Sequence, residues 1–139
     1  MNYGRIVLAT VGGMIAYFVT GFAIFFLVPQ LINEARKYPA VFRSREGQMA
    51  GMPALMAATL VAILVLAVLY AMVYRGGSGL AEGARFGALI GVFVVCAFVV
   101  HNYVNLNIGL TLALMQAVAY FVEWTVVGIV IGLLYKPSV

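Results

Sequence analysis

The sequence predicts an all-α integral membrane protein, a bundle of four transmembrane helices in a single domain over residues 1–139, with both termini on the same side. Composition is the first observation, because hydrophobic residues make up 65% of the chain and charged residues only 9%. A soluble domain is nearer half apolar, and one of this size could not hide so much apolar surface from water. Second, the chain holds four long apolar runs. Each exceeds the roughly 20 residues that cross a bilayer core.

These runs predict helices over about residues 5–31, 53–75, 82–104 and 107–135. Only helices are expected, because an open sheet edge in lipid would leave backbone groups unpaired. The first run follows Arg5 but is too long for the apolar core of a signal peptide, so it counts as a helix. Pro53 suits the first turn of the second helix, where its missing N–H has no cost.

Residues 32–52 form the one substantial predicted loop. The other two connections, "RGGSGLAEG" and the "NLN" of Asn105–Asn107, are short turns. Short turns favour antiparallel neighbours, so the second, third and fourth helices are expected to pack as an up-down series.

The distribution of basic residues does not determine which side of the membrane the termini occupy. Four lie on the side of the termini and four on the side of the long loop: Arg5, Arg75, Arg85 and Lys136 against Arg36, Lys37, Arg43 and Arg45. We favour cytoplasmic termini, and a dual topology stays open. The net charge of +4 is assigned to interfacial contacts with anionic headgroups, so nucleic acid is not an expected partner and the lipid bilayer is.

Small residues four apart mark the expected helix-packing faces. They are Gly83, Gly87 and Gly91 in the third helix, Gly128 and Gly132 in the fourth, and Ala9, Gly13 and Gly21 at similar spacing in the first. Small residues let helix backbones approach closely in lipid. Two uses stay open, which are packing within the chain and the seam of a homo-oligomer.

Glu123 is the residue with most to explain, because it lies within about 4 Å of the midplane of the fourth helix. At 100° per residue, Gln116, Tyr120, Glu123 and Val127 share one narrow face. In one interpretation Glu123 binds a cation, a proton or a polar ligand group. In the other it is a protonated structural residue, hydrogen-bonded to Tyr17 or Thr20, since burial disfavours the charged form.

His101 and Asn105 form a second cluster at the end of the third helix, on the predicted face of Gly83 and Gly87. They are candidates for the mouth of a pocket, with Gln116 at similar depth. The alternative is a helix end capped by asparagine. His101 is about 14 Å from Glu123 in depth, so direct cooperation between them is not expected.

Catalysis has little support, and we expect a protein that is not an enzyme and has no cofactor or metal. The sequence lacks HExxH, CxxC and phosphate-loop motifs, and its one histidine and four carboxylates are scattered in depth. The preferred function is a non-enzymatic module that binds a small ligand, lipid or cation around Glu123. Alternatives are a dimeric proton-coupled transporter that uses Glu123, and an accessory or scaffold subunit that docks through its glycine stripes.

The last 60 or so residues resemble small bacterial four-helix membrane proteins classed as domains of unknown function. The likeness rests on Gly83, Gly87 and Gly91, the asparagine-rich turn and "VVGIVIGLLY" of Val126–Tyr135. It implies a bundle in a bacterial inner membrane and no particular activity. The chain also looks like the small multidrug transporters, which have four helices and a lone membrane glutamate. Their acid lies in the first helix, whereas Glu123 lies in the fourth.

Overall fold

The computed structural model describes residues 1–135, and within them it has helices and no strand. The helices are α1 (Tyr3–Leu27), α2 (Pro29–Ala35), α3 (Arg45–Val73), α4 (Gly79–Val94), the π-helix η1 (Val95–Val100), α5 (His101–Asn105) and α6 (Leu110–Tyr135). Because α4, η1 and α5 run on without a break, they make one span, Gly79–Asn105. Four helices are long and apolar enough to cross a membrane, which confirms the predicted fold class.

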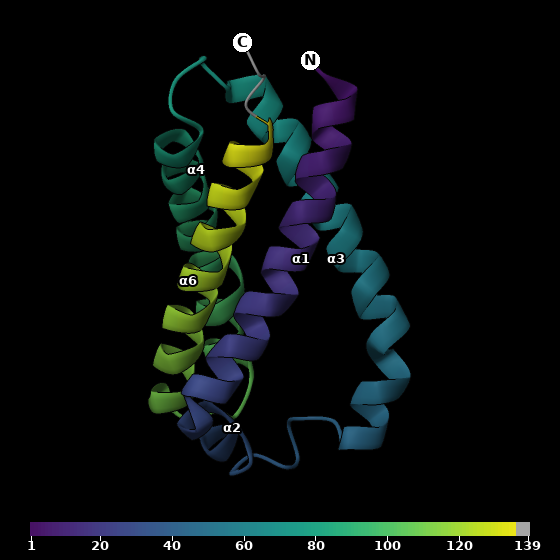
Figure 1. Cartoon of the computed structure of the whole chain (residues 1–139). Coiled ribbons are helices and arrows are strands. Elements are labelled where there is room, and N and C mark those ends of the chain that lie inside the picture. Colours follow the sequence, from purple (N-terminus) through teal and green to yellow (C-terminus); the bar gives the residue numbers. More distant parts are fainter. Residues whose placement is uncertain (136–139) are drawn as a thin grey trace.

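The two ends of the described chain lie at the same end of the bundle (Figure 1). Arg5 near the start of α1 donates a hydrogen bond from Nη1 to the carbonyl oxygen of Leu134 near the end of α6, over 3.3 Å. The predicted placement of both termini on one side is therefore confirmed. Lys136, which we counted among the basic residues of that side, lies outside the described residues.

Helix α6 is the centre of the bundle and packs against both α4 and α1. Its contact with α4 is a backbone-to-backbone contact between glycines. A Cβ built on Gly83 would lie 2.6 Å from the carbonyl oxygen of Gly128, and one on Gly87 would lie 2.7 Å from the carbonyl oxygen of Thr125. The predicted stripes of α4 and α6 thus face each other within one chain, and no larger side chain fits between them.

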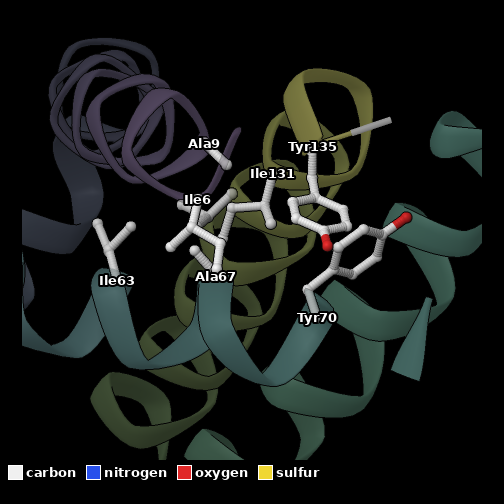
Figure 2. Close-up of a cluster of buried hydrophobic side chains, with 8 residues drawn as sticks. Ile6, Ala9, Ile63, Ala67, Tyr70, Ile131 and Tyr135 are labelled. Carbon is white, nitrogen blue, oxygen red and sulfur yellow. The ribbon is translucent and has the colours of Figure 1, made fainter. Parts of the chain in front are cut away.

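The main apolar core closes the end of the bundle where the termini lie. Its buried residues come from the start of α1, the second half of α3 and the end of α6: Ile6, Ala9, Ile63, Ala67, Tyr70, Val127, Ile131 and Tyr135. Figure 2 shows Tyr70 and Tyr135 packed against each other beside Ile6 and Ile131. Tyr70 also makes an edge-on ring contact with Phe86 of α4, at 5.3 Å between centroids. This end of the bundle is therefore well sealed.

At the other end α3 leaves the bundle. Its buried residues are Thr59, Ile63, Ala67 and Tyr70, all in its second half. Figure 1 shows α1 and α3 diverging toward the end where α2 lies. The predicted up-down order of α3, α4 and α6 is confirmed, but α3 packs chiefly on α1 and not along α4. The glycine contact holds α4 against α6, so α3 must find its place on the far side, against α1.

The predicted loop over residues 32–52 is largely helical. Helix α1 ends at Leu27, Pro29 opens α2, and α3 already begins at Arg45. Pro53 is therefore inside α3 and not in its first turn, which corrects the prediction. Ser44 caps the start of α3, since its side chain accepts a hydrogen bond from the N–H of Gly47 at 3.2 Å. Ser44 followed by Glu46 in the first turn was the available signal.

The glycine contact can be tested with Gly87→Ala. The added Cβ would meet backbone atoms of α6, so the two helices must separate, and we expect the free energy of unfolding to fall by about 1–3 kcal/mol. Unfolding in mixed micelles with increasing denaturing detergent measures this. The control is Gly51→Ala in α3, whose Cβ would meet nothing within 4 Å. It should leave stability unchanged or raise it by up to about 1 kcal/mol. Equal losses in both variants would refute the close contact.

Candidate functional site

A cavity of about 1080 Å³ lies between α1, α2, the first half of α3 and α6. It exists because α3 diverges from α1 at this end while the main core holds the other end closed. Much of its wall is apolar and includes Phe18, Phe22, Phe25, Leu55 and Leu112. Two groups of polar side chains interrupt this wall, one deep in the cavity and one at its outer end.

Glu123 is the deepest acidic group of the cavity and is only 7% exposed. Gly21 of α1 makes room for it, because a Cβ at that position would lie 2.8 Å from Oε1 of Glu123. Within residues 1–135 the carboxyl makes no hydrogen bond, and neither Tyr17 nor Thr20 donates one. Buried polar groups normally have partners. The hydrogen-bonding capacity of Glu123 is therefore directed at the cavity.

Gln116 and Tyr120 line the same cavity as Glu123, so three predicted site residues of α6 come together. The fourth residue of that stripe, Val127, is fully buried in the main core, which marks where the cavity ends. Tyr17, which the sequence predicted only as a hydrogen-bond partner of Glu123, lines the cavity from α1. Its ring also packs on Trp124, with 5.3 Å between centroids. The deep end therefore combines a carboxyl and two phenols from two helices, and the amide of Gln116 lies about 10 Å nearer the outer end.

His101 and Asn105 lie outside this site. Both are exposed, and neither lines the cavity. Val99 is buried and marks the packed face, and His101 follows two residues later, about 200° round the helix. The π-helical turns of Val95–Val100 carry fewer degrees per residue, so the predicted alignment with Gly83 and Gly87 is lost. Asn105 donates a hydrogen bond from Nδ2 to the carbonyl oxygen of His101 at 2.8 Å, which caps the helix end.

Three arginines line the outer end of the cavity, and sequence reasoning assigned them only to headgroup contacts. They are Arg36 and Arg43 of the connection 36–44 and Arg45 at the start of α3. All three are exposed, and no described carboxylate forms an ion pair with them. The nearby Glu34 forms an ion pair with Lys37 instead, with 2.6 Å between Oε2 and Nζ. The sequence could have grouped these arginines only if α3 had been predicted to start at Arg45, whereas we placed its start at Pro53.

A small second core fixes the segment that carries these arginines. Leu31 of α2 packs with Ile108 and Leu112 at the start of α6. Tyr38 accepts a hydrogen bond at its hydroxyl oxygen from the N–H of Gly109, at 3.0 Å. The outer end of the cavity is therefore a defined structure, tied to α6 on one side and leading into α3 on the other.

The polar groups of the cavity can hold a ligand by hydrogen bonds and charge. Within the described part of the chain, no three His, Cys, Asp or Glu side chains gather in a way that could hold a metal ion. Comparison with protein-family models, with curated proteins and with solved structures gives no match for this chain. The residues of the cavity themselves are therefore the basis for a functional proposal.

The tie between Tyr38 and Gly109 can be tested with Tyr38→Phe. Loss of the hydroxyl leaves the N–H of Gly109 without its partner, so we expect local opening to be easier by about 0.5–1.5 kcal/mol. Hydrogen exchange at the first turn of α6 should speed up accordingly, while exchange near the main core stays unchanged. Tyr3→Phe, at an exposed ring in α1, is the control. Unaltered exchange at Gly109 in Tyr38→Phe would contradict the proposed tie.

Proposed function

We propose that this protein is a non-enzymatic membrane module that binds a small ligand, lipid or cation in the cavity between α1, α3 and α6. The observation that carries the proposal is the Glu123 carboxyl, which is buried, has no hydrogen-bond partner among residues 1–135 and lines a large cavity. Tyr120 and Tyr17 provide donors and acceptors near this carboxyl, and Gln116 provides another about two helical turns nearer the outer end. A ligand is expected to be recognised at this deep end by hydrogen bonds or charge and along the wall by apolar contact.

The position of Glu123 supports a functional role. It is the fourteenth of the 26 residues of α6 and so lies near the middle of its span. An acidic side chain at that depth costs about 2.5–3.5 kcal/mol on insertion scales. No described residue offsets this cost by a hydrogen bond. A bound ligand, cation or proton would do so.

A proton-coupled transporter is the second candidate, and one feature favours it. The cavity is bordered by the connection 36–44 at one end, while the main core seals the end where the termini lie. A mid-span carboxyl in a cavity that is closed toward one side of the membrane is what one state of an alternating-access transporter needs. A dimeric form, or a scaffold role, would have to use surfaces other than the stripes of α4 and α6, because these pair within the chain.

We place the protein in a cell membrane, in a bacterial inner membrane by the resemblance of its second half, with the termini in the cytoplasm. The preference for this orientation is small, since basic residues are balanced between the two sides. In this orientation the arginine-lined end of the cavity faces away from the cytoplasm.

Infrared spectra of the protein in lipid test the role of Glu123. A protonated-carboxyl band that is lost in Glu123→Gln belongs to this residue. Because Glu123 borders the cavity, we expect this band to change when the pH of the buffer is varied and when a ligand binds. Glu46→Gln, at an exposed residue in the first turn of α3, is the control and should keep the band. A Glu123 band that no pH alters would mean a sealed structural carboxyl and would refute the proposal.

A further inference from the structure

We propose that the outer part of this cavity is a specific site for an anionic phospholipid of the adjacent leaflet. Its phosphate lies on Arg36, Arg43 and Arg45, and its acyl chain enters the space between α1 and the first half of α3. The inference goes beyond the proposed function, which concerns the deep end around Glu123. The lipid would close the lateral side of the cavity toward the bilayer.

The outer end of the cavity, with Arg36, Arg43 and Arg45, is called the rim below, and its charge favours an anion. Three arginines and no carboxylate line the outer end of the cavity, and none of the three guanidinium groups is paired with a described carboxylate. Glu123 is the one acid in the lining and lies about 16 Å deeper, counted from Leu112 along α6. Arginine forks match phosphate oxygens in a bidentate way and are weakly hydrated. A phosphate at the rim therefore meets complementary charge, and the lining of the cavity at that end includes no carboxylate that would repel it.

The wall beside the rim selects for an acyl chain. Phe22 and Phe25 of α1 and Leu55 of α3 all line the cavity, yet they are 71%, 50% and 47% exposed. Such large exposed fractions at membrane depth leave the apolar wall between α1 and α3 within reach of an acyl chain. Hydrocarbon fills apolar space at membrane depth. A free phosphate would satisfy the rim and leave this wall uncovered, whereas a phospholipid satisfies both.

The rim is also held in place before any lipid arrives. Tyr38 and the second core fix the connection 36–44 to the start of α6, and Ser44 caps α3 directly before Arg45. Preorganised groups lose less freedom on binding, which favours a specific site over general attraction to the membrane surface. Arg75 and Arg85, at the opposite end of the bundle, lack this combination, because they do not line this cavity.

Native mass spectrometry of the protein released from detergent micelles tests the site. The probe is an equimolar mixture of phosphatidylglycerol and phosphatidylcholine with identical acyl chains. We expect the wild type to retain one phosphatidylglycerol in preference to phosphatidylcholine. In Arg36→Gln/Arg43→Gln/Arg45→Gln this preference should fall by about fivefold for each arginine removed. Arg75→Gln/Arg85→Gln, at exposed residues of the opposite end, should keep it.

A second pair of variants tests the apolar wall. Leu55→Trp fills the space between α1 and α3 and should reduce retention of the lipid at least fivefold, whereas Leu64→Trp, at an exposed residue outside the cavity, should not.

Equal retention of the two lipids by the wild type would overturn the proposal. So would equal losses in the two arginine variants, or displacement of the lipid by an equal concentration of soluble glycerol phosphate. The infrared experiment on Glu123 has a separate readout, so either proposal can fail alone.

Discussion

The close approach of α4 and α6 determines where α1 and α3 can pack. Glycines on both sides bring the two backbones into direct contact, with Gly87 meeting the carbonyl oxygens of Trp124 and Thr125. In a bilayer the hydrophobic effect does not drive helices together, so such close packing must supply the attraction. Because one face of α6 is used in this way, α1 occupies its other face and α3 is left with α1 as its main neighbour. The cavity is the consequence of that order of packing.

Glu123 and Gly21 show how the same principle positions a polar group. A missing side chain on α1 provides the volume that the carboxyl on α6 occupies. At the termini end, Ile6 and Ala9 of α1 instead pack with Ile131 and Tyr135 of α6 in an apolar core that α3 completes. Gly21 therefore gives the carboxyl of Glu123 its space, while the small residue Ala9 at the other end of α1 is packed in the apolar core.

Sequence alone predicted the four spans, the packing glycines and the polar stripe of Gln116, Tyr120 and Glu123, because each follows from hydropathy or from helical periodicity. Such patterns describe one helix at a time. The divergence of α3 could not be predicted in this way, since it depends on competition among helices for the faces of α6. His101 was misplaced relative to Gly83 because π-helical turns leave no hydrophobic signature in a run that is apolar all round. The early start of α3 was missed because Pro53 is a stronger signal than the cap at Ser44.

Pro53 divides α3 into two mechanically different parts. The second part, from Thr59, is anchored by buried side chains, whereas the first part has none. Proline has no N–H, so the carbonyl oxygen of Met49 also lacks its usual partner within the helix. Missing packing and a missing backbone hydrogen bond coincide in the segment that forms one wall of the cavity. The first part of α3 is therefore the wall of the cavity that the rest of the bundle holds least, and a change in the width of the cavity costs least there.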